Sequence, residues 1–114
     1  MQIKINLDNL TLLEREKQLI EKKLGSLSRY CQGYSLADLE LTLGQNISQE
    51  KGKIFYGRAR LILPGKDIIV NRQGETMLSL INQIRKELKE DIIKSKKKKE
   101  SRLRRITKFF TKEQ

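Results

Sequence analysis

The sequence lacks the residues on which many enzyme active sites depend. It contains no histidine, which excludes Ser-His-Asp and Cys-His catalysis and argues against a zinc site. Its single cysteine, Cys31, excludes an internal disulfide and is typical of a reducing cytosol. No paired carboxylates stand out for hydrolytic chemistry. We therefore expect a protein that is not an enzyme and that needs no cofactor or metal ion.

Long hydrophobic runs are also missing. No apolar stretch approaches the roughly 18 residues that a membrane span requires. The N-terminus lacks the charged start and continuous apolar core of a signal peptide. Together with the single cysteine, these absences predict a cytoplasmic protein with no membrane span. We also expect no small-molecule substrate. A length of 114 residues suits one small domain followed by a tail.

Positive charge is abundant, and most of it lies at the C-terminal end. The chain has 25 Lys and Arg against 14 Asp and Glu, a net charge of +11. Residues 94–114 hold ten of these bases and two acids, so they carry +8 of the total. Such a concentration indicates an anionic partner, with a solvated charge run as the alternative. Within the tail, Leu103, Ile106 and Phe110 recur at helical spacing and could stack on bases, enter a membrane interface or pack on the body.

The alternation of apolar and polar residues predicts four strands with one buried face each. A Pro-Gly dipeptide at 64–65 predicts a tight turn, because proline presets its own φ and glycine tolerates a positive φ. A hairpin closed there would pair Leu61 with Ile68 and Ala59 with Val70. We assign strands to residues 3–7, 37–43, 53–63 and 66–71, with a flexible polar loop over 44–52.

Two amphipathic helices are predicted by apolar residues at helical spacing. The first spans about 12–30, begins with the capping-box spacing of Thr11 and Glu14, and ends near Gly33. The second begins near Glu75 and runs into the lysine block. The apolar stripes are Leu13, Ile20, Leu24, Leu27 and Cys31 on the first helix, and Met77, Ile81, Ile84, Leu88 and Ile92 on the second.

The predicted order of elements, β-α-β-β-β-α, indicates an α/β two-layer sandwich. The first strand should lie parallel beside the second after a right-handed crossover, and the remaining strands should form an antiparallel meander. Each strand offers one apolar face, so both helices must cover the same face of a four-stranded mixed sheet. This is the architecture of a double-stranded-RNA-binding domain with an extra N-terminal strand.

The outward sides of both helices are predicted to be basic. Arg15, Lys22 and Arg29 are seven residues apart and would span roughly 21 Å of the first helix. Bases spaced in this way can each meet one RNA phosphate, although surface lysines also serve solubility. The candidate RNA-binding residues are Arg15, Lys22, Lys23, Arg29, Lys86, Lys89, Lys94, Lys96, Lys97, Lys98, Arg102, Arg104 and Arg105.

The three tyrosines are too scattered along the sequence to indicate a platform for stacking bases. They are Tyr30, Tyr34 and Tyr56. Tyr56 belongs to a predicted strand, where it lies either on the open face of the sheet or in ordinary strand packing.

Six short segments occur in the order and spacing of a known family. They are residues 1–5 (MQIKI), 21–27 (EKKLGSL), 37–41 (ADLEL), 63–66 (LPGK), 75–82 (ETMLSLIN) and 94–96 (KSK). Together they resemble the ribosome hibernation-promoting family, also called ribosome-associated inhibitors or sigma-factor modulation proteins. The resemblance covers residues 1–98 as a ribosome-binding domain and leaves 99–114 as a basic C-terminal tail.

Some positions depart from the pattern of that family. Thr76, Leu78 and Leu80 replace the Asp, Tyr and Ala of the signature at the start of the last helix. Glu87 and Glu90 stand where relatives often carry bases, and the neighbouring Lys86 and Lys89 could substitute for them.

The resemblance implies binding of small-subunit rRNA in the decoding channel, where the protein would block tRNA and mRNA and inactivate ribosomes under stress. It also implies a short form, without the C-terminal dimerisation domain of longer members. Two alternatives stay open. One is a general RNA-binding or ribosome-assembly protein on the same fold. The other is a peripheral protein of anionic membranes that uses its terminal phenylalanines and lysines.

Overall fold

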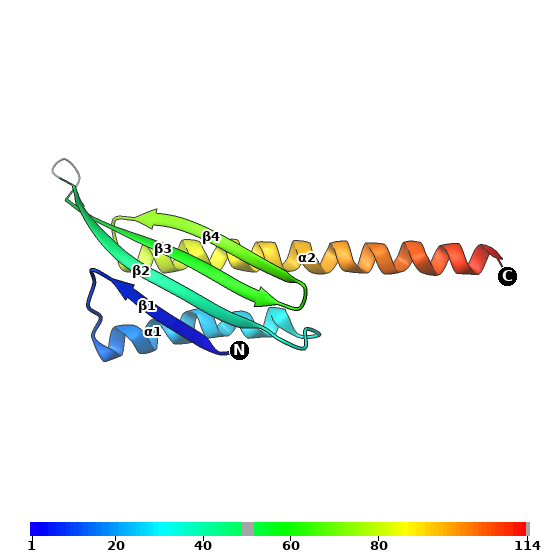
Figure 1. Cartoon of the computed structure of the whole chain (residues 1–114), viewed down its shortest axis with the longest axis horizontal. Helices are drawn as coiled ribbons and strands as arrows, with labels where there is room; N and C mark the ends of the chain where they lie inside the picture. The colour runs from blue at the N-terminus through cyan, green and yellow to red at the C-terminus, as the bar shows by residue number, and fades with distance from the viewer. Residues whose placement is uncertain (49–51, 114) are drawn as a thin grey trace.

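The computed structural model describes residues 1–48 and 52–113, and the side-chain surroundings of residues 1–47 and 52–98. Four strands form one sheet, and two helices lie behind it (Figure 1). A short 3₁₀ helix, η1, follows the first α-helix. The elements are β1 (Ile3–Asp8), α1 (Glu14–Gly25), η1 (Ser26–Cys31), β2 (Asp38–Ser48), β3 (Gly52–Leu63), β4 (Lys66–Gly74) and α2 (Met77–Glu113).

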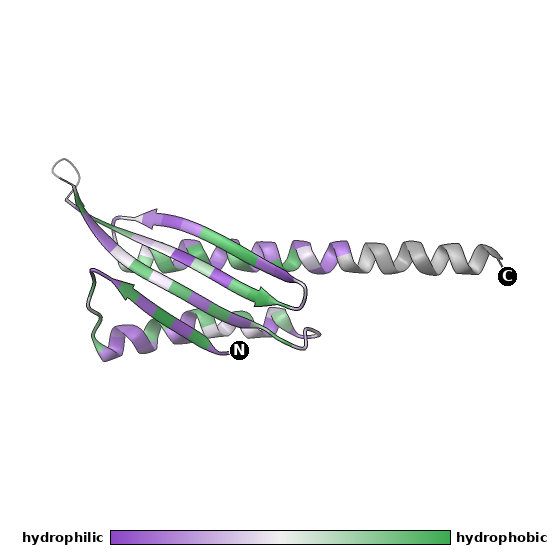
Figure 2. Ribbon diagram, viewed as in Figure 1, coloured by the Kyte–Doolittle hydropathy of each residue, from purple (hydrophilic) through white to green (hydrophobic). Residues whose placement is uncertain are grey.

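The sheet has the predicted topology. Its order is β1-β2-β3-β4, with β1 parallel to β2 and the other pairs antiparallel. The predicted hairpin register is confirmed, because Leu61 pairs with Ile68 and Ala59 with Val70. Gly65 adopts a φ of 71° at the turn, a conformation that glycine reaches without a steric penalty. Figure 2 shows hydrophilic and hydrophobic residues alternating along the strands, as a sheet covered on one face requires.

The prediction of a loop over residues 44–52 is wrong for most of its length. Strand β2 continues to Ser48 and β3 starts at Gly52, and residues 44–48 pair with residues 52–56. Residues 49–51 lie outside the described part of the chain. Backbone hydrogen bonds extend the ladder whatever the side chains are, so a polar sequence can form a strand without alternating apolar residues. For the same reason β4 continues to Gly74, past the predicted end at Asn71.

The first predicted helix is not continuous. Helix α1 ends at Gly25, and the next turn tightens into η1. The Ser26 hydroxyl donates to the Lys23 carbonyl oxygen at 2.6 Å, a local bond that competes with regular helical geometry. The predicted capping box is also wrong, because the Leu13 N–H donates to Glu16 Oε1 at 3.0 Å and the helix starts at Glu14. Leu13, expected in the buried apolar stripe, is exposed.

Helix α2 starts two residues later than predicted. Its first turn is capped by Thr76, whose Oγ1 accepts a hydrogen bond from the Ser79 N–H at 3.1 Å. Threonine thus serves as a cap at this departure from the family signature. The helix is continuous from Met77 to Glu113 and projects well past the sheet (Figure 1). The division into a domain of residues 1–98 and a tail of 99–114 stays a prediction.

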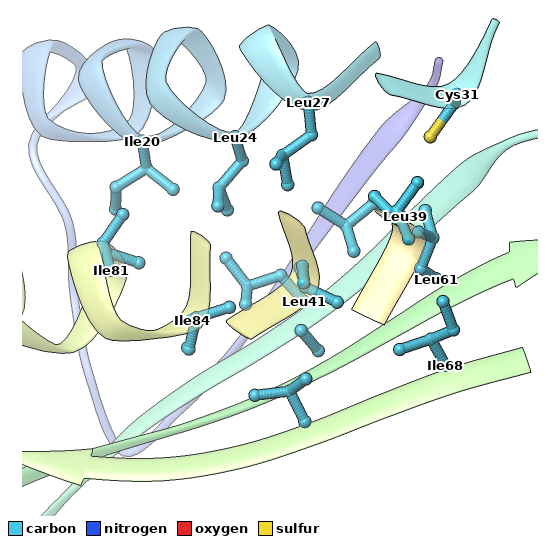
Figure 3. Close-up of a cluster of buried hydrophobic side chains, with 14 of the residues drawn as sticks. Ile20, Leu24, Leu27, Cys31, Leu39, Leu41, Leu61, Ile68, Ile81 and Ile84 are labelled. Carbon is cyan, nitrogen blue, oxygen red and sulfur yellow. The ribbon is translucent and has the colours of Figure 1, made fainter. Parts of the chain in front are cut away.

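The core lies between the sheet and the two helices. Figure 3 shows α1 and α2 directing side chains such as Leu24 and Ile84 toward Leu41 and Leu61 of the sheet. Four of the five predicted stripe residues on each helix are buried. Cys31 is one of them, and burial raises the pKa of its thiol, as expected for a packing residue.

Candidate nucleic-acid interface

Helices α1 and α2 are joined by polar contacts at the surface. Lys23 Nζ donates to Asn82 Oδ1 at 3.3 Å. Arg85 Nε donates to the Lys23 carbonyl oxygen at 3.2 Å and to Ser26 Oγ at 3.0 Å. The Arg85 guanidinium therefore lies at the C-terminal end of α1, where unpaired carbonyls favour a positive charge. Sequence reasoning missed Arg85, because its role depends on how the helices meet in space.

Basic residues from η1 and α2 converge on one aromatic ring. The Arg29 guanidinium lies 4.9 Å and Lys89 Nζ 5.2 Å from the centroid of the Tyr30 ring. Arg29 also donates to the Tyr30 hydroxyl at 2.9 Å. We call Lys23, Arg29, Tyr30, Lys89 and Lys96 the helical seam. Its charges are held in place by aromatic and hydrogen-bonding contacts, so less side-chain entropy is lost when an anion binds.

Lys96 continues the helical seam along α2. Its Nζ lies 5.9 Å from the centroid of the Tyr34 ring, and the Tyr34 hydroxyl donates to Ser95 Oγ at 3.4 Å. A row of basic groups thus runs from the end of α1 to the point where α2 leaves the sheet.

The positive charge of the helical seam affects the pKa of the Tyr30 hydroxyl. Partial burial alone would raise the pKa of its hydroxyl. The nearby Lys89 ammonium and Arg29 guanidinium outweigh that effect and lower the pKa below its ordinary value of 10.0. The same two cations that favour a phenolate here would favour a phosphate oxygen beside the ring.

The remaining candidate residues are spread over two sides of the helical layer. Arg15, Lys22 and Lys86 are exposed, with Arg15 in the first turn of α1. Lys94 and Lys98 instead line a hollow at the edge of β4, so they do not form one cluster with Lys96. Lys97 is exposed. The side chains of Arg102, Arg104 and Arg105 lie outside the described residues.

The two acidic residues that departed from the family pattern have different surroundings. Glu87 pairs with Arg72 of β4, with Oε2 2.5 Å from the guanidinium. This pair connects α2 with the sheet and directs the Glu87 carboxylate away from the helical seam. Glu90 is exposed. The effect of Glu87 on an approaching anion is therefore reduced by its own cationic partner.

Within the described residues, no group of three or more His, Cys, Asp or Glu side chains could hold a metal ion. No helix in that part of the chain is long and apolar enough to cross a membrane.

Comparison with known proteins gives a family match and two structural matches. Residues 3–100 match the family model described as "Sigma 54 modulation protein / S30EA ribosomal protein". A ribosomal subunit interface protein from Coxiella burnetii superposes with a TM-score of 0.70 at 19% identity, covering 84% of this chain and 98% of that one. The N-terminal domain of Protein Y from Thermus thermophilus gives 0.61 at 20% identity, covering 81% and 96%. No curated protein matches by sequence.

Proposed function

Because the chain belongs to the Sigma 54 modulation protein / S30EA ribosomal protein family, a family of ribosome-associated proteins, we propose that it is a ribosome hibernation factor. It binds small-subunit rRNA in the decoding channel, occupies the sites of tRNA and mRNA, and inhibits translation. Its place of action is the cytoplasm, where ribosomes translate. The structural likeness to a subunit interface protein supports the fold on which this proposal depends.

The helical seam is the observation that best supports a contact with RNA. Arg29 and Lys89 come from different elements and meet at one ring, so the fold itself creates the cationic site. Lys23 and Lys96 extend it in both directions, and the exposed Lys22 and Lys86 add charge beside it. Contacts of this type position a protein on RNA without reading its sequence.

The proposed mechanism is steric and needs no chemical step. A folded α/β body fills the channel, and basic side chains anchor it through phosphates. Each neutralised phosphate releases counterions, so affinity should fall steeply with salt. Arg102, Arg104 and Arg105 would add contacts along the mRNA path, because α2 carries the backbone of this segment away from the body.

Sedimentation with purified ribosomes at two salt concentrations tests this function. Wild-type protein should co-migrate with small subunits at low salt and be displaced by tRNA. The double variant Arg29→Gln/Lys89→Gln should bind more weakly, with a salt slope reduced by roughly 1.5 if each base meets one phosphate.

The matched control is Lys4→Gln/Lys53→Gln, which removes the same charge from exposed strand positions. It should bind almost as wild type does. Failure of the wild-type protein to co-migrate at low salt would defeat the proposal. Binding that tRNA does not displace would instead indicate a general RNA-binding or assembly protein. Flotation with anionic liposomes would indicate the membrane alternative.

A further inference from the structure

The sheet face turned away from the helices, here the open face, carries Tyr56. Its neighbour Gly57 faces α2, because a Cβ there would lie 2.7 Å from Ile84 Cδ1. Side chains alternate along a strand, so Tyr56 and Arg58 face the opposite way. The sequence left Tyr56 either on the open face or in ordinary strand packing, and the structure places it on the open face.

The Tyr56 side chain lies across the neighbouring strand. Tyr56 pairs with Gly44 of β2, and Gly44 pairs with Asp8 of β1 on its other side. A Cβ at Gly44 would lie 2.2 Å from Tyr56 Cζ, so the ring occupies the space that the glycine leaves. The Tyr56 hydroxyl reaches over β2 and donates to Asp8 Oδ2. This hydrogen bond anchors the far end of the ring on the surface of the sheet.

A hollow of about 470 Å³ lies beside this ring. Its volume falls within the roughly 300–1,000 Å³ typical of small-ligand sites. The register places Gln73 opposite Tyr56 and Asn71 opposite Arg58, so four side chains of the open face surround the hollow. It is lined by Tyr56, Gly57, Arg58, Asn71, Arg72 and Gln73.

Three of these side chains have unused hydrogen-bonding capacity. Within the described part of the chain, no hydrogen bond or ion pair engages the side chains of Arg58, Asn71 or Gln73. The next arginine along β3 differs, because Arg60 donates to Asp67 at 2.7 Å and lies 3.8 Å from Glu40. Of these two arginines, Arg58, which lies beside the Tyr56 ring, is therefore the one whose guanidinium is available to bind a ligand.

We propose that this hollow binds one unpaired nucleotide of a single-stranded RNA. The base stacks on the Tyr56 ring, the Asn71 and Gln73 amides bond its edge, and Arg58 contacts its phosphate. Aromatic side chains on a sheet surface are a general means of holding splayed bases, and amides offer both the donors and the acceptors that base edges require. This inference rests on the proposed function, which supplies RNA as the partner. The binding residues, however, lie on the sheet and not on the helices.

The open-face site and the helical seam should differ in their response to salt. The open-face hollow holds one unpaired cation, whereas the helical seam holds several bases in a row. Stacking releases no counterions, so losing the ring should weaken binding without changing the salt slope.

A short single-stranded RNA containing 2-aminopurine tests the proposal, because stacking on an aromatic ring quenches its fluorescence. Wild-type protein should quench the probe. Tyr56→Leu should abolish the quenching and weaken binding by roughly 5- to 100-fold at an unchanged salt slope. Tyr56→Phe keeps the ring and should keep most of the quenching. Ile69→Ala removes an exposed side chain one position further along the same face and should behave as wild type.

The outcomes separate this inference from the proposed function. Equal quenching by wild type and Tyr56→Leu, or no quenching by wild type, overturns the inference while ribosome co-sedimentation can still succeed. Quenching that depends on Tyr56 without ribosome binding supports the inference and defeats the proposed function. If Tyr56→Leu does not fold, Arg58→Ala/Gln73→Ala replaces it, and unchanged probe affinity in that variant overturns the proposal.

Discussion

At the residue scale, two tyrosine hydroxyls lie in opposite electrostatic surroundings. Tyr30 lies beside Lys89 and Arg29, and their charges lower its pKa despite partial burial. Tyr56 donates to Asp8, and that hydrogen bond, with desolvation and the carboxylate charge, raises its pKa. The first environment favours a phenolate, and the second favours the protonated hydroxyl.

We therefore expect Tyr30 to ionise at lower pH than Tyr56 when phenolate absorbance is followed through an alkaline titration. Tyr30→Phe should remove an early step, and Tyr56→Phe should remove a late one. Because the folded-state pKa of Tyr56 is raised, its hydrogen bond stabilises the fold fully below the unfolded value of about 10 and is lost as pH passes the folded value. A titration in which Tyr56→Phe removes the earliest step would contradict this assignment.

The sequence predicted the individual bases of the helical seam but not its organisation. Arg29 and Lys89 were both identified from the outward sides of the helices. Their meeting at Tyr30 depends on the distance between η1 and α2, and a helical projection does not contain that distance. The separation of Lys94 and Lys98 from Lys96 was not predictable either, because it depends on where the edge of β4 lies beside α2.

At the element scale, Arg85 holds the end of α1 against α2. Its Nε donates to a main-chain carbonyl and to the Ser26 hydroxyl, and the side chain is partly buried. Arg85→Ala should lower the free energy of unfolding by about 1–3 kcal/mol, because hydrogen bonds from charged groups contribute on that scale. Urea denaturation measures the change.

Lys86→Ala is the control for this variant, since it removes a neighbouring exposed base and should change stability by less than about 0.5 kcal/mol. Arg85→Lys should recover part of the loss, because lysine keeps the charge but not the planar guanidinium. Equal stability of Arg85→Ala and Lys86→Ala would show that Arg85 does not fasten the two helices.

Elements with a clear periodic pattern of apolar residues were predictable from the sequence, and elements without such a pattern were not. The hairpin around Pro64 was predicted in register, because turn chemistry and apolar pairing agree there. The β2–β3 extension over residues 44–48 was missed, because its pairing comes from the backbone and leaves no apolar alternation. The break after Gly25 was missed because Leu27 and Cys31 keep the helical stripe through the 3₁₀ turn.

At the scale of the whole molecule, a sheet-and-helix body is joined to a projecting basic segment. The longest dimension is 68 Å against 29 and 18 Å, and α2 accounts for the elongation (Figure 1). If α2 enters an RNA channel, the body could dock while the segment extends along it. The elongated shape would then place positive charge along the channel, because one continuous helix, α2, holds the C-terminal basic residues away from the sheet.

Removing residues 100–114 tests the contribution of this segment. The truncation deletes five bases and two acids, and leaves every described core residue in place. If all five bases meet phosphates, the slope of log affinity against log salt should fall in magnitude by roughly 3.5, at about 0.7 per phosphate. Ribosome binding across a salt series measures it, with circular dichroism showing that the body stays folded. Unchanged affinity and an unchanged slope would mean that residues 100–114 contribute nothing to ribosome binding.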